Sequence, residues 1–203
     1  MTEEDVATFQ RCMAVGGVAL FPADTVYGLA TEPDSGEGID RLYRLKARRP
    51  DQPAAVMFFE RDLALEALPE LPRETKTAAE RLLPGGVTLL LPNSARRFPL
   101  ACAPNPDVLG LRVPQLTGAL TPLRAMRWPV LQSSANPSGG RDARRIEDVD
   151  QRIRAGVDLI LDAGELPGTP STVVDLTVYH EDGRFEIVRD GAVPTEAIRD
   201  ALG

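Results

Sequence analysis

The sequence predicts an α/β protein with a mixed β-sheet. Short apolar runs rich in Val, Leu and Phe recur along the chain, segments with apolar residues at helical spacing lie between them, and Pro or Gly separates the two kinds of segment. The order of the strands does not follow from these patterns. Because 43% of the 203 residues are hydrophobic, the chain can fill a core, and we expect residues 1–203 to form a single domain.

Helices are predicted where apolar residues recur every three or four positions. Thr2 can cap the first helix, in which Val6, Phe9 and Met13 share one face before Gly16 and Gly17 end it. The other predicted helices are one after Ser35 that buries Ile39, Leu42 and Tyr43, residues 61–83 with proline interruptions, a weak helix at 118–127, one that carries Ile146, Val149 and Ile153, and residues 195–202 with Ile198 and Leu202 inward.

Strands are predicted in apolar runs that turn residues bound. The first run stops at Pro22, and we expect a tight turn at Gly28. Loops are expected in the Pro- and Gly-rich stretches 99–106 and 166–170. The predicted strands are residues 18–21, 54–59, 87–91, 109–113, 129–131, 157–161, 172–176 and 185–188.

Charge and composition exclude several classes of protein. A net charge of −7 disfavours tight sequence-independent binding to nucleic acid, because such binding neutralises phosphates. Cys12 and Cys102 are distant from each other, so neither a disulfide framework nor a zinc site is expected. The acidic N-terminus lacks the cationic start of a signal peptide, and no apolar run approaches the roughly 20 residues of a membrane span. We therefore expect a cytoplasmic protein.

Familiar catalytic and nucleotide-binding motifs do not occur. The single histidine, His180, lies in a predicted hairpin turn, which argues against a His-based triad or a multi-His metal site. Neither the P-loop pattern nor GxGxxG is present. Any nucleotide site must be built differently.

Residues 132–140, Gln-Ser-Ser-Ala-Asn-Pro-Ser-Gly-Gly, follow a predicted core strand. Short hydroxyl side chains and glycines there leave backbone N–H groups free for phosphate or carboxylate oxygens. An ordinary polar loop would have the same composition, so this stretch alone leaves both interpretations open.

Basic residues occur at two further places where an anion could bind. Lys46 and Arg48 end a predicted helix just before Pro50, where they could clamp a polyphosphate or merely offset the helix dipole. Arg112 lies inside an apolar strand, so it needs either a ligand carboxylate or an internal acid as its partner. Thr25 and Asp24 after the first strand, Ser171 before a strand, and Arg189 after one are weaker candidates.

Taken together, these segments resemble a known family. Pro-Ala-Asp-Thr-Val-Tyr-Gly-Leu (22–29), Lys-Ala-Arg (46–48), Pro-Gly-Gly-Val-Thr (84–88), Leu-Arg-Val-Pro (111–114), Ser-Ser-Ala-Asn-Pro-Ser-Gly (133–139), Pro-Ser-Thr-Val-Val-Asp (170–175) and Val-Arg-Asp-Gly (188–191) occur in this order. The chain is similar over nearly its whole length to the YrdC/TsaC family of L-threonylcarbamoyladenylate synthases, in its compact form.

The resemblance implies a fold and a reaction. The fold would be a twisted mixed β-sheet flanked by helices, with a concave basic cleft. The enzyme would be a nucleotidyltransferase that makes threonylcarbamoyl-AMP and pyrophosphate from L-threonine, bicarbonate and ATP, with Mg²⁺ accompanying ATP and no metal site of its own. Partner proteins of the tRNA-modification pathway would then transfer the group to tRNA, which the enzyme itself could also contact; no membrane is involved.

The resemblance also implies roles for individual residues. Lys46 and Arg48 would be catalytic, placed on the phosphates. The ATP-binding residues would be Arg48, Gln52, Ser134, Asn136 and Arg189, and the threonine-binding residues Thr25, Arg112, Gln132 (through its backbone) and Ser171.

Several positions depart from the family pattern. Ala23 removes a hydroxyl from the first motif, Gln52 replaces Lys or Asn, and Met57 stands where longer relatives carry a threonine-binding histidine. Asp142 places an acid where relatives contact ATP, and Val108 offers only its backbone. These departures leave open a paralogue with an altered substrate. A non-catalytic RNA-binding module also stays open, because a basic concavity could form from Arg41, Arg44, Lys46, Arg48, Arg49, Arg141, Arg144 and Arg145.

Overall fold

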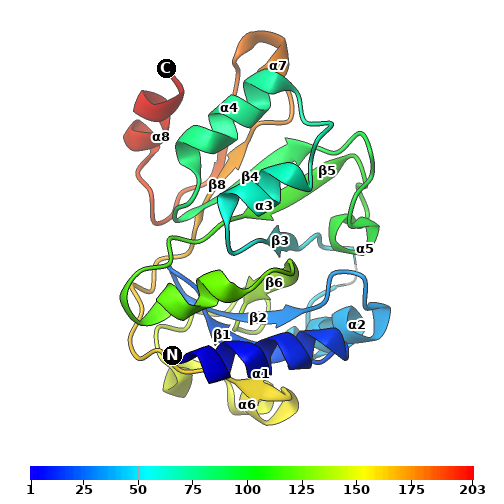
Figure 1. Cartoon of the computed structure of the whole chain (residues 1–203), viewed down its shortest axis with the longest axis vertical. Helices are drawn as coiled ribbons and strands as arrows, with labels where there is room; N and C mark the ends of the chain where they lie inside the picture. Colours follow the sequence, from blue (N-terminus) through cyan, green and yellow to red (C-terminus); the bar gives the residue numbers. More distant parts are fainter. Residues whose placement is uncertain (50) are drawn as a thin grey trace.

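A computed structural model describes residues 1–49 and 51–203 of the chain, and its strands form one nine-stranded mixed sheet (Figure 1). The order across the sheet is β7-β1-β2-β6-β3-β5-β4-β8-β9. Three neighbouring pairs, β1/β7, β3/β5 and β4/β8, are parallel and the others antiparallel, so the predicted mixed α/β class is confirmed. The strands are β1 (Ala19–Pro22), β2 (Tyr27–Thr31), β3 (Ala55–Met57), β4 (Val87–Pro92), β5 (Val108–Arg112), β6 (Val130–Ser134), β7 (Leu159–Ile160), β8 (Thr172–Asp175) and β9 (Glu186–Arg189).

Helices flank the sheet, and polar side chains cap the starts of the first two. Thr2 caps the first helix: its hydroxyl accepts a hydrogen bond from the Asp5 N–H at 3.2 Å, and the Asp5 carboxylate accepts one from the Thr2 N–H. Ser35 caps the second through the Gly38 N–H at 3.1 Å. The helices are α1 (Glu3–Ala14), α2 (Gly36–Lys46), α3 (Arg61–Glu66), α4 (Arg73–Leu82), α5 (Pro99–Cys102), α6 (Gln151–Gly156), α7 (Tyr179–Asp182) and α8 (Thr195–Leu202), with 3-10 helices η1 (Gly118–Ala125) and η2 (Ile146–Asp148).

The predicted turn at Gly28 is wrong, because Gly28 lies inside β2 and pairs with Ser134 of β6. A Cβ at Gly28 would lie 2.8 Å from Nε2 of Gln132. Glycine is therefore needed here because the neighbouring strand approaches closely, and not because the chain turns. Strand β6 also continues beyond Leu131 to Ser134, which places the first three residues of the 132–140 stretch in the sheet.

Other boundaries differ from prediction for local reasons. The 61–83 segment is two helices, α3 and α4, because Pro69 and Pro72 interrupt it. The helix expected around Ile146–Ile153 is split into η2 and α6, since Asp150 caps a new start. The 54–59 strand is limited to β3, the 118–127 helix is a 3-10 helix, and the 99–106 loop contains α5. Pro50 lies outside the described residues.

The two faces of the sheet are covered differently. Leu20, Leu29, Val56, Leu111 and Leu89 lie on one face, in the core that they form with α2, α3, α4, α6 and α8. On the opposite face, a smaller core packs α1 and η1 over β1 and the adjacent ends of β3 and β6. Figure 1 shows α4 and α8 together at one end of the molecule, and α1 and α6 at the other. The part of the second face nearer α4 and α8 carries the polar side chains of the cleft described below.

Gly191, which follows β9, packs closely against the backbone of residues 170–172. A Cβ there would lie 2.4 Å from the Pro170 carbonyl oxygen and 2.5 Å from the Thr172 nitrogen, both rigid backbone atoms. We predict that Gly191→Ala lowers the free energy of unfolding by about 1–3 kcal/mol through overpacking. Gly36→Ala is the matched control, because no atom lies within 4 Å of its added methyl group and alanine favours the helix. Urea denaturation of both variants checks this, and equal effects would contradict it.

Candidate functional site

A cleft of about 490 Å³ opens over the second face of the sheet. Because side chains alternate between the two faces along each strand, only every second residue of a strand points to the cleft. These residues are called the floor. Gln132 and Ser134 of β6 lie opposite Ala30 and Gly28 of β2, and Ala55 of β3 pairs with both Gln132 and Gly110. The floor residues that line the cleft are Ala55, Thr88, Leu90, Val108, Gly110, Arg112, Gln132, Ser134, Val173, Asp175 and Arg189.

Small residues occupy the middle of the floor and leave a depression there. Ala55 and Gly110 pair across β3 and β5, and a Cβ on Gly110 would already lie 3.4 Å from the Ala55 Cα. Longer polar side chains surround this depression, including Arg112, Gln132 and Arg189. The arrangement leaves open space between cationic groups that come from distant parts of the sequence.

Arg112 is 3% exposed and holds an internal partner. Its Nη2 donates to Oδ1 of Asp24 at 2.6 Å and to Oγ1 of Thr25 at 3.2 Å, and Oδ2 of Asp24 accepts from the Gln115 N–H. Burial lowers the pKa of Arg112, and the charge of Asp24 opposes this. Of the two partners that the sequence leaves open, the internal acid is present, while Arg112 also lines the cleft.

Lys46 does not line the cleft but supports its edge. Its side chain is 1% exposed, and its ammonium donates to the carbonyl oxygen of Asn136 at 2.7 Å, to Oδ1 of Asn136 at 3.1 Å and to the carbonyl oxygen of Ser134. These three contacts use all three N–H donors of the ammonium. Burial and the nearby Arg48 lower the pKa of Lys46 to about 8. In this structure Lys46 holds the chain after β6 in place.

Asn136 closes that same chain segment. Its Nδ2 donates to the Gly140 carbonyl oxygen, its Oδ1 accepts from the Ser134 hydroxyl at 2.6 Å, and the Ser138 N–H donates to the Lys46 carbonyl oxygen at 2.8 Å. Ser134 lines the cleft, whereas Asn136 is buried below it. Ser134 and Asn136, both predicted to bind ATP, therefore lie side by side. Asn136, however, stabilises the conformation of the chain segment after β6.

Arg48 reaches the cleft because helix α2 ends two residues earlier. Ala47 adopts a left-handed conformation with φ of 48°, and the Arg48 N–H returns to the Tyr43 carbonyl oxygen at 2.9 Å. The guanidinium then donates to Oγ of Ser133 at 3.2 Å and lies 5.6 Å from the centre of the Tyr43 ring. Gln52 is not among the lining residues, and its carbonyl oxygen accepts from the Tyr43 hydroxyl.

Ser171, Thr88 and Arg189 form the opposite side of the cleft. The Ser171 and Thr88 hydroxyls are 2.7 Å apart, and Nη2 of Arg189 donates to the Ser171 carbonyl oxygen at 2.7 Å. Arg112 and Arg189 are close enough for the charge of Arg189 to lower the pKa of Arg112. The predicted residues Arg48, Arg112, Gln132, Ser134, Ser171 and Arg189 thus line one cleft, and Thr25 is bound to Arg112 behind it.

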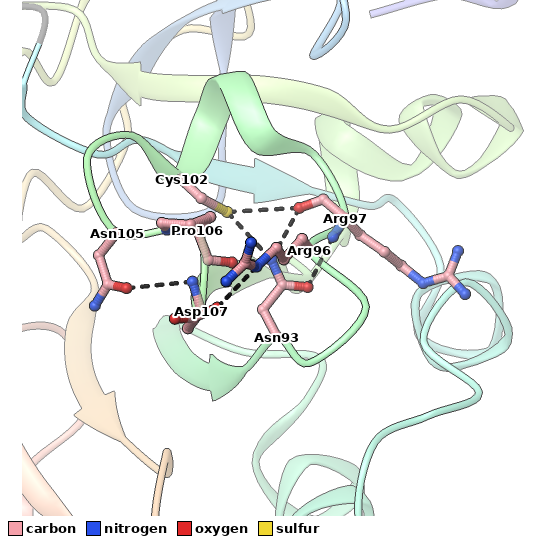
Figure 2. A network of polar contacts seen from close by, with 7 residues as sticks. All are labelled: Asn93, Arg96, Arg97, Cys102, Asn105, Pro106 and Asp107. Atoms are coloured by element: carbon pink, nitrogen blue, oxygen red, sulfur yellow. Dashed lines mark hydrogen bonds and ion pairs between the residues drawn. The ribbon is translucent and has the colours of Figure 1, made fainter.

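A loop between β4 and β5 supplies one wall, and Figure 2 shows the polar network that orders it. Asn93 is 2% exposed; its Nδ2 donates to the carbonyl oxygens of Arg97 and Pro106 at 3.0 and 2.9 Å, and its Oδ1 accepts from the Arg97 N–H. This loop places Cys102 and Asn105 on the cleft. Burial raises the pKa of the Cys102 thiol to about 11, so it is protonated at neutral pH and a poor nucleophile.

The lining carries both signs of charge. Arg48, Arg112 and Arg189 share it with Asp142 and Asp175, so a basic cleft stays a prediction. Sequence patterns do not predict Asn93, Asn105 or Asp175 as site residues, because isolated Asn and Asp residues near strand ends carry no local signal. Met57 is fully buried in the core beneath α1 and η1 and is not among the lining residues, although it pairs with Arg112 between β3 and β5.

Two other kinds of feature are absent from residues 1–49 and 51–203. In these ranges no three His, Cys, Asp or Glu side chains gather in a way that would hold a metal ion. Over the same ranges, every helix is too short or too polar to cross a membrane.

Comparison with known proteins identifies relatives. The Sua5_yciO_yrdC family model, described as "Telomere recombination", matches residues 11–191. The threonylcarbamoyl-AMP synthase of Pyrococcus abyssi is 29% identical over 189 residues, which is 93% of this chain and 54% of that protein. The mouse synthase is 30% identical over 88% of this chain and 64% of its own length. The chain thus spans about half to two thirds of these relatives.

Solved structures agree on the fold. The crystal structure of P. abyssi Sua5 complexed with L-threonine matches with a TM-score of 0.83 and 26% identity, over 100% of this chain and 58% of that one. Escherichia coli YciO, at 23% identity, shows the same fold with a TM-score of 0.78 over 97% of this chain and 94% of its own. The predicted fold class is therefore confirmed.

The buried ammonium of Lys46 predicts a pH dependence of stability. Its pKa of about 8 in the folded protein is below the ordinary value of 10.5, so folding disfavours the protonated form and this penalty disappears as pH rises from about 8 to 10.5. Relative to Lys46→Met, the wild type should gain about 2 kcal/mol between pH 7 and pH 9.5. Denaturant titrations of both proteins at each pH measure the difference, and a constant or falling difference would refute the prediction.

Proposed function

The chain belongs to the Sua5/YciO/YrdC family, and from this we propose that it is an L-threonylcarbamoyl-AMP synthase that uses L-threonine, bicarbonate and ATP. The observation that carries the proposal is the convergence of Arg48, Arg112 and Arg189 on one cleft beside short hydroxyl side chains. Guanidinium groups suit carboxylate and phosphate oxygens, and both substrates carry such groups.

We place threonine at the Arg112 side of the cleft. Arg112 would bind the amino-acid carboxylate, and its contacts with Asp24 and Thr25 would fix its orientation before the substrate arrives. Ser171, which contacts Thr88 and Arg189, would provide a second polar contact. The P. abyssi Sua5 structure, whose described ligand is L-threonine, supports this choice of substrate.

We place ATP between Arg48 and Arg189. Arg48 would hold phosphate oxygens from one side and Arg189 from the other, while Ser134 would contact the nucleotide at the end of β6. Lys46 and Asn136 would act indirectly by holding the segment that carries Ser134. A direct ATP contact of Gln52 stays a prediction, and Mg²⁺ would enter as part of the ATP substrate.

The reaction requires positioning more than proton transfer. The threonine amine combines with bicarbonate to form a carbamate and water, and a carbamate oxygen then attacks the α-phosphorus of ATP. The bond from that phosphorus to the bridging oxygen breaks, and pyrophosphate leaves with the electron pair. Arg48 and Arg189 would stabilise the charge that develops on the phosphate oxygens. Partner proteins in the cytoplasm would then transfer the product's threonylcarbamoyl group to tRNA.

A direct assay tests the activity. The protein is incubated with ATP, bicarbonate and threonine, and pyrophosphate is measured with and without each substrate. We expect release that depends on both threonine and bicarbonate. Release with another amino acid alone would indicate a paralogue with an altered substrate, and salt-sensitive RNA binding without ATP turnover would indicate a binding module.

Mutation of Arg48 tests the proposed ATP site most directly. Arg48→Ala should lower kcat/KM for ATP by about 100-fold, because one charged donor to the transition state is lost. Arg49→Ala is the matched control: this neighbouring arginine is largely exposed and pairs with Asp51. Equal activities of the two variants in the pyrophosphate assay would remove Arg48 from the ATP site.

A further inference from the structure

Gln132 has a side chain that the roles proposed above do not use. It lies on the floor with an alanine on each side, Ala30 of β2 and Ala55 of β3, and is 5% exposed at the cleft. Its Nε2 would be 2.8 Å from a Cβ at Gly28, which shows that the amide extends over the glycine on β2. The glycine and the two alanines leave room for this long side chain.

The amide of Gln132 makes no hydrogen bond with any residue in the ranges 1–49 and 51–203, although other polar residues of the floor do. Arg112 donates to Asp24, Ser134 donates to Asn136, and Arg189 donates to Ser171. Although the residue is only 5% exposed, neither amide atom is among the fully buried unpaired side-chain atoms of these ranges, so the amide faces the open cleft, where a ligand can replace water as its partner. Gln132 therefore offers an unused donor and acceptor to the contents of the cleft.

The chemistry of the amide selects among the groups of the bound substrates. The carboxylate and phosphates already have guanidinium partners in Arg112, Arg48 and Arg189. A primary amide can donate and accept at once, and the groups that match both are the threonine hydroxyl, the ribose hydroxyls and the adenine edge, so position decides among them. The register places Gln132 in one row with Ala55 and Gly110, and Arg112 lies in the adjacent row with Met57, so the amide adjoins the amino-acid side of the cleft.

We propose that the Gln132 amide binds the side-chain hydroxyl of the substrate amino acid and determines selection of a hydroxy amino acid over its apolar isostere. The inference rests on the proposed synthase activity, and it assigns the side chain of Gln132 a role separate from the backbone contact expected from the sequence. A site built to pair a substrate hydroxyl rejects an analogue that lacks it, because the protein group is then left unpaired.

The test compares threonine with valine, which replaces the hydroxyl by a methyl group. Wild-type protein and Gln132→Met, a substitution of similar length, are assayed for amino-acid-dependent pyrophosphate release at saturating ATP and bicarbonate. We expect Gln132→Met to lower the ratio of kcat/KM for threonine to that for valine by about 10- to 100-fold. The KM for ATP should stay unchanged.

Gln151→Met is the matched control, since Gln151 is an exposed glutamine at the start of α6. Gln132→Ala serves as a second variant if Gln132→Met fails to fold by circular dichroism. An unchanged ratio in an active variant, or a change confined to the KM for ATP, would overturn the assignment of Gln132 alone. Absence of threonine-dependent release from the wild type would overturn the proposed function and, with it, this assignment.

Discussion

The cleft depends most on the hydrogen bonds that the buried ammonium of Lys46 donates. The ammonium joins the end of α2 to the chain after β6 through oxygens of Ser134 and Asn136, residues far away in the sequence. Burial of a charge is costly unless hydrogen bonds compensate, and here every N–H of the ammonium has an acceptor. One end of this link carries Arg48 and the other carries Ser134, so both groups have fixed positions relative to each other before any ligand binds.

Strand register explains why scattered motifs form one site. Alternation sends Leu89, Leu111 and Leu131 into the larger core and the intervening residues onto the floor. A shift of one residue in β5 would exchange Arg112 for an apolar neighbour and expose the core. The apolar face therefore sets the positions of the polar groups, and stability and ligand binding are specified by the same pairing.

Elements with strong local patterns could be predicted from the sequence. Helices α1 and α2 follow their caps and apolar spacing, and α8 follows its apolar spacing alone. Six of the predicted site residues meet at the cleft. Strand β2 was missed because Gly28 has the composition of a turn, whereas its role depends on Gln132 across the sheet. The pairing of Arg112 with Asp24, and the ordering of a wall by Asn93, are long-range or loop-specific contacts that no sequence period encodes.

The sheet continues without interruption beneath the cleft, from β2 through β6, β3 and β5 to β4 and β8. Proteins that close by hinge bending usually have separate lobes joined by a few flexible residues. A hydrogen-bonded platform that crosses the whole site resists such bending. Any shielding of bound ligands from bulk water would therefore come from movement of surface loops and not from closure of the two flanks of the molecule.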